Sequence, residues 1–196
     1  MKAIVLGAGQ GIVRQNEDDS IPKCLITDPF GQRVLDWIID SLKQAGIKQI
    51  VFVGGFHLEK VMPNYPDLKY YINPNWDYTG MLESLFCAKP ELGSPFLVSY
   101  SDVVYRPEIV KNLLNSNADI SLAVDKNWRD RYVGRMDSLL MEAEKVITTE
   151  GCISNIGKQI DLQEAISGEF TGLALFNKKG ARTLQESFSK IRNLYK

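Results

Sequence analysis

Apolar positions along the chain gather in short runs, and three of these runs predict strands. Residues 2–6, 50–53 and 96–100 are mostly aliphatic or aromatic, as in strands that are buried on both faces. Between the first two runs, four apolar residues within 35–42 recur at helical spacing, and Gly46 supplies a stop signal. A strand, a helix and a strand of these lengths predict a parallel pair with a right-handed crossover.

The rest of the pattern predicts further strands and helices and changes character beyond residue 130. Strands are expected at 69–72, 120–124 and 168–176, helices at 80–89, 107–115 and 180–194, and a long loop at 12–32. Short strands with turns are expected at 139–146 and 151–159, where the pattern favours antiparallel pairing. These elements predict a three-layer α/β/α fold, with a mostly parallel, Rossmann-like sheet and a small antiparallel region.

Composition and charge exclude several classes of partner. The chain has 196 residues, of which 44% are hydrophobic and 24% charged, as in an ordinary globular domain. Its formal net charge is −1, so no strong field would attract nucleic acid or an anionic membrane. The three cysteines are widely spaced and His57 is the single histidine, so neither a disulfide framework nor a zinc site is expected. Because the sequence shows neither a membrane-spanning run nor a signal-peptide pattern, we expect a soluble cytoplasmic protein.

Three segments follow predicted strands and are candidates for ligand binding. They are Gly7–Gly11, Gly54–Phe56 and Ser101–Asp102. In open parallel sheets, ligands bind beyond the carboxyl ends of the strands, so these segments are expected to lie at one edge. The edge could therefore form a nucleotide site.

The chemistry of this edge points to phosphate, although each motif also has a simpler interpretation. The glycine-rich segment Gly7–Gly11 could cradle phosphate with its backbone N–H groups, or it could be a tight turn. No helical pattern follows it, as a dinucleotide-binding fingerprint requires, and no Gly-Lys-Ser/Thr follows it, as a P-loop requires. Lys23 follows Pro22 and could neutralise phosphates or be a solvated lysine. Asp102 could hold Mg²⁺ or cap a turn.

Taken together, these motifs resemble a known family. The order is Gly-Ala-Gly-Gln-Gly at 7–11, then Arg14, then Pro-Lys-Cys-Leu at 22–25, then a strand that ends in Asp102. This order resembles the nucleotidyltransferases that make nucleotide-sugars, which have the nucleotide-diphospho-sugar transferase fold. Residues 73–84, 125–128 and 168–172 are similar to cytidylyltransferases that act on phosphocholine and on phosphonates. The likeness spans residues 2–177, and it implies a single nucleotidyltransferase domain over 1–196.

The resemblance implies a role for each matching position. The nucleotide would be held by Leu6, Gly7, Ala8, Gly9, Gln10, Gly11, Gly54, Gly55, Asn73, Thr79, Gly80, Ser84 and Ser101. The phosphates would be neutralised by Arg14 and Lys23, and Lys126 would face the α-phosphate or the acceptor. The acceptor would lie beside Trp128, Arg129 and Glu169, and Asp102 would bind Mg²⁺.

Two departures from the family pattern affect this interpretation. Both Ile12 and Val13 separate the last loop glycine from Arg14, where the family has one residue, so Arg14 lies one position further along the chain than the family pattern has it. The family also closes with a strand and an Asp-x-Asp-like segment that supplies a second metal carboxylate, and residues 1–196 contain no such segment. We therefore expect either a truncated sequence or a second ligand from elsewhere.

The implied reaction is the Mg²⁺-dependent transfer of CMP from CTP to a small phosphonate or phosphocholine-like acceptor, with release of pyrophosphate. Arg129, Arg131 and Arg135 favour a phosphonate, whereas an aromatic cage of Trp76, Tyr78, Trp128 and Tyr132 would favour choline. One alternative is a sugar-1-phosphate nucleotidyltransferase that uses UTP, dTTP or GTP. Another is a non-catalytic nucleotide-binding module. The sequence does not set the oligomeric state, and it is compatible with a homodimer.

Overall fold

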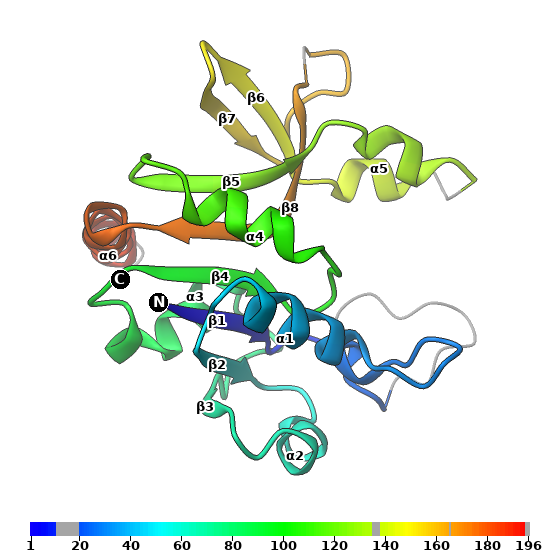
Figure 1. The fold of residues 1–196 in the computed structure, drawn as a ribbon. Coiled ribbons are helices and arrows are strands. Elements are labelled where there is room, and N and C mark those ends of the chain that lie inside the picture. The colour runs from blue at the N-terminus through cyan, green and yellow to red at the C-terminus, as the bar shows by residue number, and fades with distance from the viewer. Residues whose placement is uncertain (11–19, 135–137, 165, 195–196) are drawn as a thin grey trace. The chain divides into compact units, whose positions relative to one another are not determined.

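The computed structural model describes residues 1–10, 20–134, 138–164 and 166–194, and the chain divides into two compact units. The first unit contains Met1–Ser121 and Ala174–Lys196, and the second contains Leu122–Leu173 (Figure 1). Strands β5 (Ile120–Asp125) and β8 (Gly168–Phe176) run through the two boundaries between the units. Each unit is described separately below.

Four parallel strands form the centre of the first unit. They are β1 (Lys2–Gly7), β2 (Gln49–Gly54), β3 (Lys69–Ile72) and β4 (Phe96–Tyr100), in the order β3-β2-β1-β4. Both neighbours of β1 run parallel to it, and so does β3 beside β2. Strands β1, β2 and β4 are almost entirely buried, which explains why their sequences read as continuous apolar runs.

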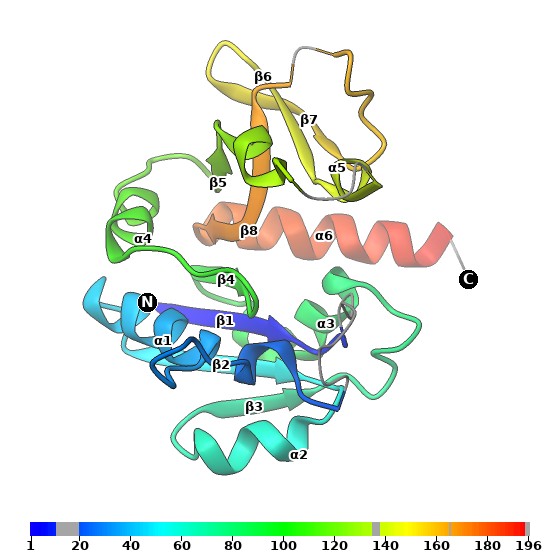
Figure 2. The same ribbon diagram turned by 90° about the vertical axis from the view of Figure 1, so that its right-hand side faces the viewer.

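Helices cover both faces of this sheet. They are α1 (Val34–Gln44), α2 (Leu58–Val61), α3 (Met81–Cys87), α4 (Pro107–Leu114) and α6 (Lys178–Leu194), with short 3₁₀ turns at Lys23–Leu25, Met62–Asn64 and Lys89–Glu91. Helices α1 and α4 pack together on one face, and α3 packs on β1 and β2 from the other (Figure 2). The stacked rings of Phe86 and Phe188 join α3 to α6, with centroids 3.6 Å apart.

The second unit is built on antiparallel strands. Strands β6 (Lys145–Thr149) and β7 (Cys152–Gly157) form a hairpin, and β6 also pairs antiparallel with β8, which β5 joins. The hairpin turn consists of Glu150 and Gly151, and both have positive φ angles, of 52° and 79°. Two such residues match the twist of the flanking strands in a two-residue turn. A 3₁₀ turn (Trp128–Tyr132) and helix α5 (Ser138–Glu142) complete this unit.

The structure confirms the expected fold class, a parallel core sheet with added antiparallel strands, and it corrects one element. Residues 139–146 were expected to be a strand, but they form most of α5 and the start of β6. The reason is local: the buried Lys145 side chain donates to the carbonyls of Met141 and Ala143, at 3.3 and 3.2 Å, and so satisfies the end of the helix. A short apolar run cannot by itself distinguish these two outcomes.

Candidate functional site

The carboxyl ends of β1, β2 and β4 meet at one edge of the first unit, as the sequence predicted. Gly7 at the end of β1 is in register with Gly54, and Leu6 is in register with Tyr100. Beyond β4, the Ser101 N–H donates to the Leu6 carbonyl at 3.1 Å. The three candidate segments therefore lie side by side, which is the geometry that a shared ligand requires.

Two glycines allow this edge to pack closely. A Cβ on Gly7 would lie 2.5 Å from the Phe52 ring, and a Cβ on Gly55 would lie 2.6 Å from the Trp76 Cβ and 2.8 Å from the Ala8 carbonyl oxygen. Both distances are too short for a real side chain. Trp76 lies within the run 73–84 that the resemblance placed along the nucleotide site, and it was named individually only for an aromatic cage. The pair of glycines after a strand is the sequence signal for its close approach to this edge.

The turn that carries Lys23 lies near Asp102. Cys24, in the same 3₁₀ turn, is 1% exposed and anchors the turn in the core. Burial raises the pKa of the Cys24 thiol to about 12, and the negative charge of Asp102 contributes to the rise. Asp102 itself is exposed at the end of β4. The turn that carries the predicted phosphate ligand Lys23 thus lies within electrostatic range of the predicted metal ligand Asp102.

The segment after β3 joins this edge through its backbone. The Asn73 N–H donates to the Gly54 carbonyl at 2.8 Å, and the Asn73 side-chain amide donates to the hydroxyls of Thr79 and Ser84. Gly80 precedes α3 as its N-cap residue. These four predicted nucleotide ligands are therefore assembled beside β2, and direct contact with a nucleotide stays a prediction for each of them.

A pocket of about 430 Å³ adjoins this segment. It lies between α3 and α6 and is lined by Asn73, Pro74, Asn75, Thr79, Leu82, Glu83, Phe86, Cys87, Phe188 and Ile191. Its polar end belongs to the predicted site, and its other end is apolar. Burial raises the pKa of the Cys87 thiol on this wall.

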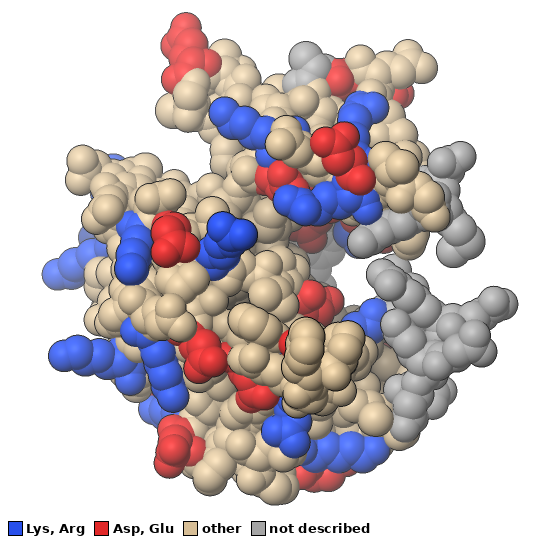
Figure 3. Space-filling view, turned by 45° about the vertical axis from the view of Figure 1, so that its right-hand side comes forward, with Lys and Arg blue, Asp and Glu red and all other residues tan. Residues whose placement is uncertain are grey.

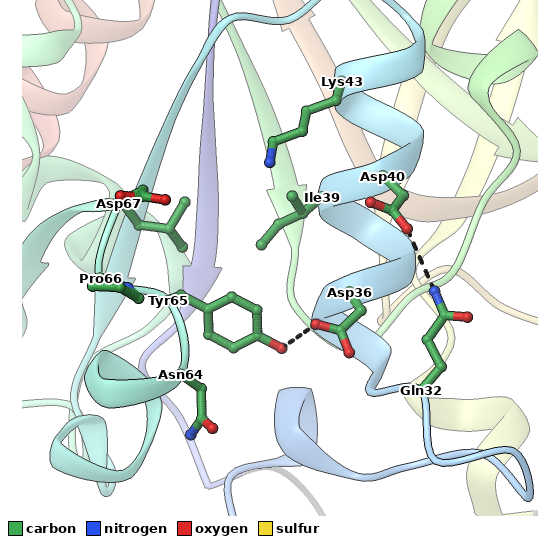
Figure 4. Close-up of a pocket in the computed structure, with 10 residues that line it drawn as sticks. Gln32, Asp36, Ile39, Asp40, Lys43, Asn64, Tyr65, Pro66 and Asp67 are labelled. Carbon is green, nitrogen blue, oxygen red and sulfur yellow. Dashed lines mark hydrogen bonds between the residues drawn. The ribbon is translucent and has the colours of Figure 1, made fainter.

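A second pocket, of about 450 Å³, lies beside α1 and contains none of the predicted site residues (Figure 4). The Tyr65 hydroxyl donates to the Asp36 carboxylate at 2.7 Å, and the pKa of Tyr65 is raised by burial first and by this bond second. The other Asp36 oxygen accepts from the Arg33 N–H at 2.9 Å and so caps α1. Both oxygens of Asp36 thus have structural partners.

The predicted acceptor residues all lie in the second unit. Trp128 is 2% exposed, and the Arg129 guanidinium lies over its ring at 5.1 Å while donating to the Leu162 carbonyl at 3.1 Å. The Tyr132 hydroxyl donates to Glu169 at 2.7 Å. Lys126 is exposed. Burial leaves Trp128 in a packing role here, since little of its ring is accessible to a ligand.

The arginine clamp and the aromatic cage both stay predictions, and the structure describes some of their members. Arg131 forms an ion pair with Asp125, and Arg129 already has the partners named above. Of the cage rings, Trp76 and Tyr78 lie in the first unit, whereas the other two belong to the second. Among the described residues, Arg129 and Arg131 therefore already have partners within the second unit.

Three predicted positions lie outside the described residues, namely Gly11, Arg14 and Arg135. Among the described residues, no three His, Cys, Asp or Glu side chains gather closely enough to hold a metal ion. A single exposed carboxylate such as Asp102 fits Mg²⁺ as a hard oxygen ligand, because Mg²⁺ in nucleotide sites is commonly held by one or two carboxylates, water and phosphate oxygens.

Charges on the molecular surface are mixed. Basic and acidic side chains are interspersed over the face shown in Figure 3. In the part of the chain that the structure describes, no helix is long and apolar enough to cross a bilayer.

Comparison with known proteins gives consistent results for family and fold. Residues 3–162 match the family model described as the MobA-like NTP transferase domain. The chain is 33% identical over 187 residues to the CTP:phosphoglutamine cytidylyltransferase of Campylobacter jejuni subsp. jejuni serotype O:2, with 90% of this chain and 73% of that protein covered. The structure of the inositol-1-phosphate CTP transferase from T. maritima superposes with a TM-score of 0.72 at 26% identity, covering 96% of this chain and 74% of that chain.

Proposed function

Since the chain belongs to the MobA-like NTP transferase family and is a nucleotidyltransferase, we propose that it transfers CMP from CTP to a small phosphorylated acceptor and releases pyrophosphate. The observation that carries this proposal is the similarity, over nearly the whole chain, to a relative that is a CTP-dependent cytidylyltransferase. The assembled edge of β1, β2 and β4 supports it, because a nucleotide site belongs at this place in the fold.

Each unit has a separate part in this proposal, and together they serve one nucleotidyltransferase reaction. In the first unit, backbone N–H groups of residues 6–11 hold the nucleotide phosphates, and Lys23 and Arg14 neutralise the β- and γ-phosphates. In the second unit, Lys126, Arg129 and Glu169 lie on the acceptor side. Mg²⁺ bound at Asp102 would stabilise negative charge on the phosphates.

The reaction needs positioning more than acid–base chemistry. An acceptor phosphate oxygen forms a bond to the α-phosphorus of CTP, and the bond from that phosphorus to the bridging oxygen of the β-phosphate breaks, so pyrophosphate leaves with the electron pair. The attacking oxygen is already ionised at neutral pH, and no general base is required. Because both reactants are anions, cationic side chains must hold them in line and offset their repulsion.

Pyrophosphate release tests the proposal directly. Wild-type protein with Mg²⁺ is assayed with CTP, UTP, GTP and dTTP, each against phosphocholine, 2-aminoethylphosphonate, inositol-1-phosphate, phosphoglutamine and a sugar-1-phosphate. Release with CTP and one acceptor supports the proposal and identifies the acceptor. Release with another NTP and a sugar-1-phosphate would replace it with the sugar-nucleotide alternative. CTP binding by calorimetry without turnover would support the non-catalytic alternative.

A further inference from the structure

Asn73 is a buried amide whose hydrogen bonds all remain within the protein. Its side chain follows β3 and is 3% exposed. The Nδ2 group donates to Thr79 Oγ1 at 2.8 Å and to Ser84 Oγ at 2.9 Å, and Oδ1 accepts from the Asn75 N–H at 3.0 Å. Both amide protons are therefore committed, and Asn73 could contact a nucleotide only by giving up one of these bonds.

The partners of Asn73 fix the direction of each bond. The Thr79 hydroxyl donates its proton to the Asn75 carbonyl at 2.7 Å, and the Ser84 hydroxyl donates its proton to the Gly80 carbonyl at 3.2 Å. Each hydroxyl has a single proton, so each must accept from the Asn73 amide. An aspartate at position 73 would have the same shape, but its carboxylate could only accept hydrogen bonds. The hydroxyls of Thr79 and Ser84 already donate their protons to backbone carbonyls, so they have no proton left for it.

The same residue ties this segment to the nucleotide edge. The backbone N–H of Asn73 donates to the Gly54 carbonyl, and three residues further on Trp76 packs so close to Gly55 that no Cβ fits between them. Thr79 ends the segment and lines the pocket between α3 and α6. Residues 75–80 are thereby held beside the ends of β1 and β2 by the packing of Trp76 and by the hydrogen bonds of the buried Asn73 side chain.

From this arrangement we infer that Asn73 is a positioning residue that pre-forms the nucleoside side of the site by fixing residues 75–80, with Ser84 as its buried partner. The inference rests on the proposed function, because it takes the edge of β1 and β2 as the nucleotide site. When a segment is already ordered before binding, the binding free energy is not reduced by the entropy of ordering it. The hydrogen bonds of Asn73 therefore affect nucleotide affinity and selectivity. The phosphates, where bonds change, are held by other groups.

The test is Asn73→Asp, which preserves shape and removes both donors. We expect the KM for CTP to rise about tenfold or more and the preference for CTP over UTP to fall, while kcat changes by less than about threefold. Asn64→Asp is the matched control, since this exposed amide makes one bond to the Lys60 carbonyl in the same unit, at 2.8 Å, and should leave all three quantities unchanged.

The outcomes separate this inference from the proposed function. A folded Asn73→Asp protein with wild-type CTP KM and selectivity, and a change in Tm alone, would overturn the inference. If that variant does not fold, the KM for CTP and the CTP selectivity of Ser84→Ala test the inference instead. Ser84 is 3% exposed, and removing its hydroxyl leaves one Asn73 donor without its acceptor. If wild-type protein uses another NTP, the proposed function fails and the variants are measured with that nucleotide. Wild-type protein that neither binds nor turns over any NTP overturns both.

Discussion

Glu91 offers a quantitative test of how charge stabilises the first unit. Its carboxylate is almost fully buried and accepts from Lys2 at 2.6 Å, from Lys69 at 2.5 Å and from the Tyr71 hydroxyl at 2.9 Å. Lys2 begins β1 and Lys69 begins β3, so one carboxylate connects two strands across the intervening β2. Replacing Glu91 with Gln removes the charge and leaves two ammonium groups without their counter-ion.

The pKa gives the size of the expected effect. Hydrogen bonds from Lys2 and then from Lys69 lower the pKa of Glu91 from its usual 4.5 to about 2. Since one pKa unit corresponds to about 1.4 kcal/mol, the ionised group stabilises the folded state by about 3 kcal/mol at neutral pH. Lys69 is half exposed, so solvent screening reduces the expected effect to about 2 kcal/mol.

The pH dependence gives the sign. A carboxyl whose pKa is lowered by folding contributes its full stability above pH 4.5, and it loses that contribution as the pH falls toward 2. Urea unfolding of wild type and Glu91→Gln should therefore show a difference of about 2 kcal/mol at pH 7 that shrinks progressively below pH 4.5. Glu186→Gln is the control, because Glu186 pairs with Arg182 on the surface and should matter little. A difference that stays constant from pH 7 to pH 3 would refute the reasoning, since it would then come from packing.

Further predictions concern the site. Lys23→Ala and Asp102→Asn should each lower kcat/KM about a hundredfold or more, measured by pyrophosphate release, and Asp102→Asn should also raise the Mg²⁺ requirement. Gly55→Ala should destabilise the protein by about 1–3 kcal/mol in urea unfolding and weaken CTP binding, because its Cβ has no room. Iodoacetamide at pH 8 should label exposed Cys152 in the folded protein and Cys24 only after unfolding, as peptide mass spectrometry would show, because the Cys24 thiol is buried with a pKa of about 12.

Matched variants make these outcomes specific. Lys111→Ala removes an exposed lysine from α4 and should keep wild-type kinetics. Gly93→Ala adds a Cβ where nothing lies within 4 Å, so its stability should be close to that of wild type. Wild-type kinetics in both Lys23→Ala and Asp102→Asn would contradict the assignment of Lys23 to phosphate and of Asp102 to the metal. Equal stability of Gly55→Ala and Gly93→Ala would show that the structure around Gly55 can relax. Rapid labelling of native Cys24 would mean that its turn opens readily.

The parts of the fold that could be predicted are those that local patterns determine. Strand β4 and strand β8 have the bounds that their mostly apolar sequences predicted, because largely buried strands read as near-continuous apolar runs. The edge formed by Gly7, Gly54 and Ser101 was predicted as well, since parallel strands place their carboxyl ends together.

The remainder depends on side-chain contacts, some local and some tertiary, that no pattern of apolar residues records. Lysine is rarely buried, and no spacing rule would place Lys145 at 0% exposure under the end of α5. Asn73 was predicted to touch the nucleotide, and its three internal bonds become visible only when residues 75, 79 and 84 are brought around it. Trp128 was expected to face the acceptor, but it is buried.

The way in which the chain passes between the two units has a consequence for how such proteins diversify. Residues 122–173 leave the first unit through β5 and return through β8, and these strands pair with each other. The Thr171 hydroxyl donates to the Ala123 carbonyl at 3.1 Å, so the exit and the return are neighbours. An inserted module with adjacent ends can be exchanged at two junctions without rethreading its host. Under the proposed function, in which the acceptor side belongs to the second unit, a graft of residues 122–173 from a relative should transfer acceptor preference while the host keeps its nucleotide edge.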